Sequence, residues 1–113
     1  IWKGLVGSEM CIRDSVMSTQ TILEMYKVDK NAAMAASFDY MMQTGYLLGG
    51  WHLAASSLVA IDLLARDEKT LFCQRKIATT EFYLHRLMPR ASAYADAILS
   101  PVSQLDGYAA DWL

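Results

Sequence analysis

The side chains that could do chemistry are few: two histidines, a glutamate one helical turn from one of them, and two cysteines. Glu81 and His85 have the i, i+4 spacing that places both on one face of a helix, where a further carboxylate could complete a metal site. The Glu-x-x-His spacing of di-iron helix bundles is not present, so we expect these two residues to form a surface pair. His52, beside Trp51, is expected to be a core histidine with one hydrogen-bonded ring nitrogen. No metal-binding residue is therefore predicted.

The cysteines give no stronger sign of catalysis. Cys73 has no histidine near it in the sequence that could activate a thiolate. Cys11 lies in an atypical N-terminal segment, and Cys73 by itself can form neither an internal disulfide nor a thiolate metal site. The sequence also has no glycine-rich phosphate loop and no serine at a nucleophile elbow. We therefore predict no catalytic or cofactor-binding residue, and a reducing, cytoplasmic setting.

The charge balance argues against one large class of partners. The 113 residues include 10 Lys and Arg against 12 Asp and Glu, which gives a net charge of −2. Without an excess of basic residues, no nucleic-acid-binding surface is expected. A chain of this length buries only about two-thirds of its unfolded surface, so the core is expected to be small.

The segment Leu5–Ser15, with the sequence LVGSEMCIRDS, differs in character from the rest of the chain. Ser8 followed by Glu9 could begin a helix, yet no apolar stripe continues the pattern. Reverse-translated, the segment is similar, in register throughout, to the transposon adapter used to prepare DNA sequencing libraries. We therefore interpret residues 1–15 as a non-native segment, and residues 16–113 as a domain from a longer protein whose beginning is lost.

From residue 16 onward the hydrophobic pattern has the period of helices, and no strand pattern competes with it. We predict an all-α fold, a helical bundle fragment built on a long antiparallel helix pair with a shorter N-terminal helix. The short helix is expected at residues 18–28 and the pair at residues 32–66 and 68–99. In the first long helix the apolar positions are Met34, Phe38, Met41, Met42, Leu48, Trp51, Leu58 and Leu64. In the second they are Leu71, Phe72, Ile77, Phe82, Leu84, Leu87, Tyr94 and Ile98.

Breaks in this pattern set the expected helix ends. Asn31 is expected to cap the first long helix and Asp67 the second, because both side chains accept hydrogen bonds from the free N–H groups of a first turn. Pro89 should kink the second helix, since proline removes one backbone hydrogen bond and clashes with the preceding turn. The tail from Val102 to Leu113 is expected to form a turn that docks its aromatic side chains onto the bundle.

The stretch from Met41 to Ile61 carries no formal charge and is long enough to suggest a membrane span. Gly45 and Gly49 have the small-xxx-small spacing of membrane helix pairs. Polar residues interrupt the stretch, however, and favour a helix buried in a protein interface: Gln43, Thr44, His52, Ser56 and Ser57. Each glycine costs about 1 kcal/mol of helix propensity, so a close contact is expected at Gly45, Gly49 and Gly50. We expect the first two to mark where the long helix meets residues 82–88 or a neighbouring element.

Two stretches resemble the C-terminal helical domain of acyl-CoA dehydrogenases. The run DYMMQTGYLLGGWHLAASSLVA is similar to the segment that opens this domain in a subgroup of the family. The run FCQRKIATTEFYLHRLMPRASAYADAI resembles the second helix of the domain more specifically, at Lys76, Ile77, Ala78, Thr79, Phe82, Tyr83, Leu87, Met88 and Pro89. The resemblance covers residues 18–98 and includes the loop between the helices. The chain departs from the family pattern at His85 and Arg86.

The subgroup includes 3-methylmercaptopropionyl-CoA dehydrogenase-like enzymes. By this resemblance the parent protein is an FAD-dependent enzyme that oxidises an acyl-CoA to the 2,3-enoyl-CoA, with a glutamate as base and flavin N5 as hydride acceptor. Those groups belong to upstream domains, so Glu81 is not assigned as the base, and this fragment is expected to be non-catalytic and to hold no cofactor. Its expected partners are the upstream catalytic body and a neighbouring subunit of a homo-oligomer. The alternative is a free-standing helical protein-interaction module with no enzymatic parent.

Overall fold

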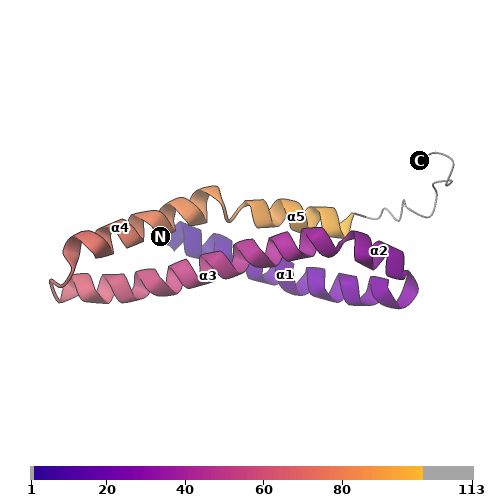
Figure 1. Cartoon of the computed structure of the whole chain (residues 1–113), viewed down its shortest axis with the longest axis horizontal. Helices are drawn as coiled ribbons and strands as arrows, with labels where there is room; N and C mark the ends of the chain where they lie inside the picture. The colour runs from indigo at the N-terminus through magenta and orange to yellow at the C-terminus, as the bar shows by residue number, and fades with distance from the viewer. Residues whose placement is uncertain (1, 101–113) are drawn as a thin grey trace.

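The structure, a computed structural model, describes residues 2–100, with side chains from residue 9 onward. This part of the chain is all-α and contains five helices: α1 Trp2–Val28, α2 Lys30–Ala35, α3 Ser37–Ala65, α4 Thr70–Arg86 and α5 Arg90–Leu99. Figure 1 shows that α2 and α3 follow one another, while α4 and α5 return antiparallel along α3. Because α1 packs beside them, the result is a narrow bundle of about 66 by 26 by 18 Å. The all-α class and the antiparallel pair are confirmed.

The N-terminal helix is longer than predicted, because α1 begins at Trp2 and includes the atypical segment. Cys11 is buried there against Leu84, Met88 and Ala91, and this packing gives the segment a reason to stay helical that its sequence pattern did not show. Further along α1, the hydroxyl oxygens of Thr19 and Tyr40 lie 2.7 Å apart and join α1 to α3. The non-native origin of residues 1–15 stays a prediction, as does the boundary at residue 16.

The first long helix is divided near its start. Asp29, rather than the predicted Asn31, is the N-cap of α2, and its side chain accepts hydrogen bonds from two backbone N–H groups, including that of Asn31. Ala36 then forms a turn between α2 and α3, and the Ser37 hydroxyl donates to the Met34 carbonyl. The predicted helix at 32–66 is therefore two helices, and the Ser37 hydroxyl bonds a backbone carbonyl at the turn that separates them.

The loop between α3 and α4 also differs from expectation, because Asp67 ends α3 instead of capping α4. Its φ of 57° places it in the left-handed region. There its N–H donates to the Leu64 carbonyl, while the N–H of Glu68 donates to the Leu63 carbonyl. These two bonds form a Schellman motif, which satisfies the final carbonyls of the helix. The N-cap of α4 is Lys69, which makes no side-chain cap.

Pro89 has a stronger effect than the predicted kink, because α4 and α5 are separate helices. The N–H groups of Leu87 and Met88 both donate to the Tyr83 carbonyl, and α5 begins after Pro89. Proline has no N–H to continue the ladder and its φ suits a helix start, so the chain closes one helix and opens the next. The predicted turn and docking of residues 102–113 lie outside the described residues.

The core contains smaller and more polar side chains than predicted. The buried positions of α3 are Gln43, Gly50, Ser57 and Ala60. Most of the large residues expected to form the core stripe of the first long helix are exposed instead: Met34, Phe38, Met41, Leu48, Trp51 and Leu58. In the other helices of the pair, Leu71, Phe72 and Phe82 are exposed, while Leu84 and Ile98 are buried as expected. Helices that cross closely need small residues at the contact, so α3 turns its small face inward.

Candidate docking surface

The residues with potential for chemistry do not form a site. Glu81 and His85 are both exposed on α4, and His52, expected in the core, is exposed on α3. Within residues 2–100 no cluster of three His, Cys, Asp or Glu side chains could hold a metal ion. The features that the described part of the chain does show are its packing surfaces.

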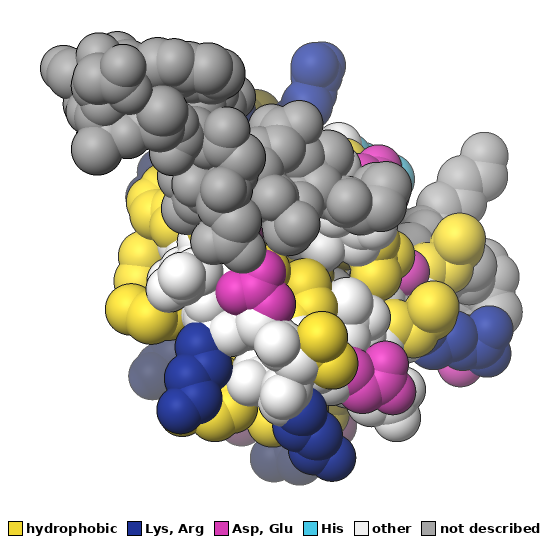
Figure 2. Space-filling model, turned by 90° about the vertical axis from the view of Figure 1, so that its right-hand side faces the viewer, with side chains coloured by type: hydrophobic (Ala, Val, Ile, Leu, Met, Phe, Trp, Pro, Cys, Tyr) yellow, Lys and Arg dark blue, Asp and Glu magenta, His cyan; other side chains and the backbone are white. Residues whose placement is uncertain are grey.

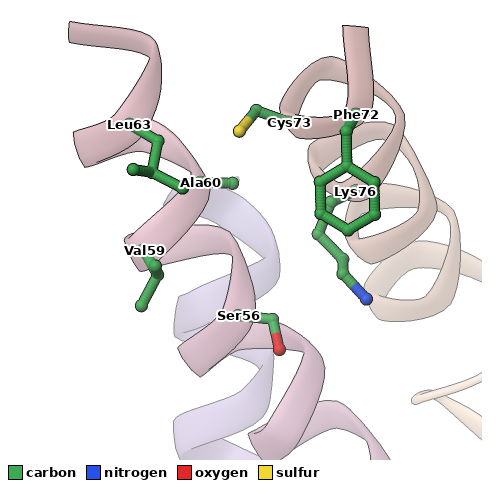
Figure 3. A pocket seen from close by; sticks show the side chains of 7 residues that line it. All are labelled: Ser56, Val59, Ala60, Leu63, Phe72, Cys73 and Lys76. Carbon is green, nitrogen blue, oxygen red and sulfur yellow. The ribbon is translucent and has the colours of Figure 1, made fainter. Parts of the chain in front are cut away.

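Cys73 lies at a cavity between α3 and α4. Its side chain is fully buried, and the sulfur is 3.8 Å from the carbonyl of Glu68. The cavity measures about 270 Å³, and its lining is mostly apolar: Ser56, Val59, Ala60 and Leu63 from α3, with Phe72, Cys73 and Lys76 from α4. Figure 3 shows the Cys73 sulfur directed into the space between the two helices, across from Ala60. This placement makes Cys73 a packing residue.

The cavity does not fit a flavin. Pockets for drug-sized ligands measure roughly 300–1,000 Å³ and use a few converging polar groups to fix the ligand. Here the volume is smaller, about 270 Å³, and only Ser56 and Lys76 bring polar side-chain atoms to the lining. A large, charged dinucleotide would find no set of partners among these residues, so no step of a flavin reaction can be assigned to them.

The three glycines of α3 differ in what lies next to them. A Cβ added at Gly49 would lie 2.5 Å from the Tyr83 hydroxyl oxygen, and one added at Gly50 would overlap the end of the Met88 side chain. A Cβ at Gly45 would meet nothing within 4 Å. The predicted meeting of Gly49 with residues 82–88 is therefore confirmed. Gly45 meets nothing in the described chain, so for this glycine only the alternative contact, with a neighbouring element, stays a prediction. The approaching groups are side chains, which periodicity alone could not identify.

Tyr83 holds this contact in place through its hydroxyl, which donates a 2.7 Å hydrogen bond to the carbonyl of Tyr46. Burial, and to a smaller extent the nearby Tyr46, raises the pKa of Tyr83 above its ordinary value. Tyr46 in turn stacks on Tyr94 of α5, with ring centroids 6.0 Å apart. Tyr83 of α4 is thus hydrogen-bonded to α3, and Tyr46 of α3 stacks on α5, beside Gly49 and Gly50.

A second polar contact joins α3 and α4 nearer their loop. Ser57 and Thr80 are both buried, and the Ser57 hydroxyl donates a 2.5 Å hydrogen bond to the Thr80 hydroxyl oxygen. The Thr80 hydroxyl oxygen in turn lies within hydrogen-bonding distance of two backbone carbonyls, 2.9 Å from that of Lys76 and 3.2 Å from that of Leu53. Hydrophobic periodicity did not reveal this pair, although the seven-residue spacing of Gly50 and Ser57 on α3 was a usable signal.

Many apolar side chains of the described residues are exposed to solvent, and packing within the bundle does not explain them. Figure 2 looks along the bundle and shows apolar side chains reaching the surface on several sides, between charged ones. By length and composition α3 could cross a membrane: its mean hydropathy is 1.5 over a window of which only 17% is buried. Exposed apolar residues in such numbers mark a surface that normally meets a partner. On α4 we call the exposed residues Leu71, Phe72 and Phe82 the α4 surface.

Comparison with known proteins decides the family. The sequence model described as "Acetyl-CoA dehydrogenase C-terminal like" matches residues 10–105, most of the chain. The chain belongs to this family of acyl-CoA dehydrogenase C-terminal domains. It is also 38% identical, over 65 residues, to the 3-methylmercaptopropionyl-CoA dehydrogenase of Ruegeria pomeroyi. The resemblance noted in the sequence is therefore confirmed.

The extent of that similarity matters for function. The matched region covers 58% of this chain but only 11% of the Ruegeria pomeroyi enzyme. No solved structure matches the chain. The matched region therefore corresponds to a small part of its curated relative.

Proposed function

We propose that this chain is the C-terminal packing module of a flavin-dependent acyl-CoA dehydrogenase, whose parent enzyme oxidises an acyl-CoA to the 2,3-enoyl-CoA. The module itself does no chemistry. It packs against the catalytic body of the same enzyme through the α4 surface. Family membership supports the enzyme class, and the Ruegeria pomeroyi relative supports a 3-methylmercaptopropionyl-CoA dehydrogenase-like parent.

The observation that carries the packing role is the exposure of Leu71, Phe72 and Phe82 on α4, each at least 60% accessible to solvent. Burying such side chains contributes roughly 1.5–3 kcal/mol each. A partner surface that covers them would therefore stabilise the assembled enzyme. The partner proposed is the catalytic body, because most of the relative's length lies outside the matched region.

FAD in the parent enzyme would supply the redox chemistry by accepting a hydride. Residues of the catalytic body would hold it, because the cavity between α3 and α4 does not fit it. We place the enzyme in the cytoplasm, in keeping with the free thiol of Cys73, which suits a reducing compartment.

A chimeric enzyme tests this proposal. The matched region of the Ruegeria pomeroyi enzyme is replaced by the corresponding residues of this chain, and acyl-CoA oxidation and retained flavin are measured. We expect a soluble, yellow, active enzyme, whereas deletion of the region should yield aggregated or inactive protein.

Two variants of the chimera locate the contact. Phe82→Asp on the α4 surface should lower soluble yield or thermal stability markedly. Gln74→Asp, at another exposed position of the same helix, should leave both unchanged. An inactive chimera that folds, or equal effects of the two variants, would contradict the proposed packing role.

A further inference from the structure

The interior of the bundle contains four polar atoms that have no hydrogen-bond partner within the described residues. They are the amide nitrogen and oxygen of Gln43 and the hydroxyl oxygens of Ser18 and Thr44, all of them buried. Gln43 and Ser18 are each 0% exposed. We call these three residues the polar layer. Native proteins pair nearly all buried polar groups, either with protein groups or with ordered water, so a partner is expected for this layer.

The three residues of the polar layer lie at one level of the bundle. The helices α1 and α3 run antiparallel (Figure 1), and the hydroxyl oxygens of Thr19 and Tyr40 lie 2.7 Å apart between them. Ser18 directly precedes Thr19, while Gln43 follows Tyr40 by less than one turn. In an antiparallel pair, a step back along one helix corresponds to a step forward along the other. Ser18 therefore faces the turn of α3 that carries Gln43 and Thr44.

Helix α5 borders this layer with a small side chain. The Tyr94 ring centroid lies 6.4 Å from that of Phe38 and 6.0 Å from that of Tyr46, so Gln43, between those two residues of α3, is at the same level. Ala95, the next residue of α5, is 1% exposed. Short side chains at this level are compatible with a molecule of the size of water beside the amide.

The chemistry of the polar layer selects the molecule that it can bind. A glutamine amide offers an acceptor oxygen and two donor hydrogens, and each hydroxyl can both donate and accept. The partner must therefore be able to donate and to accept at one place. All three residues are neutral, and α3 carries no formal charge between Tyr40 and Ile61, so an ion held by them would lack a counter-charge. Water meets these conditions, since a buried water molecule makes about three hydrogen bonds.

We infer that ordered water is bound between α1 and α3, held by the Gln43 amide and the hydroxyls of Ser18 and Thr44. Water donates to Gln43 Oε1, and Gln43 Nε2 donates to water. The hydroxyls complete the hydrogen bonding on either side of the amide. The inference goes beyond the packing role proposed above and uses no residue of the α4 surface.

Bound water also fixes the register of α1 on α3. Cys11 and Ser18 are both buried and lie seven residues apart on α1, and Met25 follows at the same spacing. A shift of α1 by seven residues would keep the same face inward but would place Cys11 or Met25 opposite Gln43. The amide and its water would then lose the Ser18 hydroxyl. A polar residue at a single core position specifies the register of packed helices in this way.

A high-resolution crystal structure of the whole chain tests the site directly. We expect electron density for at least one water molecule about 2.7–3.2 Å from an amide atom of Gln43 and from the hydroxyl oxygen of Ser18 or Thr44. The inference fails if the amide bonds directly to another side chain, or if no density lies beside it.

Apolar replacement of the amide distinguishes a hydrated site from a dry one. Methionine has nearly the helix propensity of glutamine and a similar length, so Gln43→Met removes the polar groups with little other change. If water is bound, this variant leaves the Ser18 hydroxyl without its partner, and the urea midpoint should fall by about 0.5 M or more. A dry amide would be unsatisfied in the wild type, so its removal would raise the midpoint, and that result would overturn the inference.

Two further variants complete the comparison. Gln20→Met, at an exposed position of α1, is the matched control and should leave the urea midpoint unchanged. Ser18→Ala should be more favourable in the Gln43→Met background than in the wild type, because the hydroxyl then has no water to bond. Equal effects of Ser18→Ala in the two backgrounds would contradict a shared water. None of these measurements involves the catalytic body, so the bound water and the packing role can fail separately.

Discussion

The three glycines of α3, Gly45, Gly49 and Gly50, allow the most specific prediction about stability. Gly45 and Gly49 lie one turn apart on the same helix, and alanine should stabilise a helix by up to about 1 kcal/mol relative to glycine. At Gly45 a new Cβ meets nothing within 4 Å, so Gly45→Ala should gain most of that amount. At Gly49 the new Cβ would lie 2.5 Å from the Tyr83 hydroxyl oxygen and 3.1 Å from the ring carbon that bears it.

The phenol must therefore move, and its 2.7 Å hydrogen bond to the Tyr46 carbonyl is lost or weakened. Overpacking costs about 1–3 kcal/mol and a hydrogen bond contributes about 0.5–1.5 kcal/mol. Against the helix gain of up to about 1 kcal/mol, Gly49→Ala should destabilise by about 0.5–3.5 kcal/mol net. At Gly50 the atom in the way is the terminal methyl of the flexible Met88 side chain, so Gly50→Ala should cost less.

Urea denaturation of the three variants and the wild type measures these differences. The expected order of midpoints is Gly45→Ala above wild type and Gly49→Ala below it. In a Tyr83→Phe background, which removes the obstructing oxygen, the cost of Gly49→Ala should shrink. If Gly49→Ala raised the midpoint as much as Gly45→Ala, the close contact between α3 and Tyr83 would be refuted.

Four further outcomes are expected. Thr80→Val should destabilise by about 1–3 kcal/mol, because it leaves the buried Ser57 hydroxyl without its acceptor, and adding Ser57→Ala should recover part of the loss in a double-mutant cycle of urea midpoints. The raised pKa of Tyr83 favours the neutral phenol in the folded state. The stability that this group contributes is therefore complete below the unfolded pKa of about 10 and is lost as the pH rises through the folded pKa. Tyr83→Phe should flatten the fall in the free energy of unfolding above about pH 10. If residues 1–15 are a translated adapter, deleting them should preserve cooperative thermal unfolding, because such a segment would have no evolved fit to the core. A loss of the transition would show that the contacts of Cys11 belong to the domain. The purified chain should elute from gel filtration without flavin absorbance and should show no acyl-CoA oxidation, whereas a stable yellow protein would contradict the division of labour proposed here.

The sequence by itself was enough for the class of the fold and for the family. Helical periodicity and the polar interruption after Arg66 located the antiparallel pair and the loop between α3 and α4, and Pro89 marked where the second helix is irregular, because these signals act within a few residues. The motif from Lys76 to Pro89 was specific enough to indicate the C-terminal domain of an acyl-CoA dehydrogenase. Gly49 and Gly50 correctly indicated a close contact, since nothing else compensates their cost in a helix.

Helix ends were predicted less well, because several residues compete for the same backbone groups. Asp29 and Asn31 are both good caps, and only the folded backbone shows that Asp29 accepts the bonds. Asp67 was expected to begin a helix and instead ends one, in a left-handed conformation that a sequence pattern does not distinguish from a cap.

Tertiary structure alone decided which face of α3 points inward. Both faces repeat every seven residues, and hydrophobicity favours the face with Trp51 and Leu58, yet the buried face has Gly50 and Ser57. The reason is physical: α4 and the turn after it approach closely enough for Tyr83 and Met88 to occupy the space beside Gly49 and Gly50, and only small residues permit that distance. Sequence periodicity indicates that a face is apolar. Which element covers that face depends on the shape of the neighbouring helices, within this chain or beyond it.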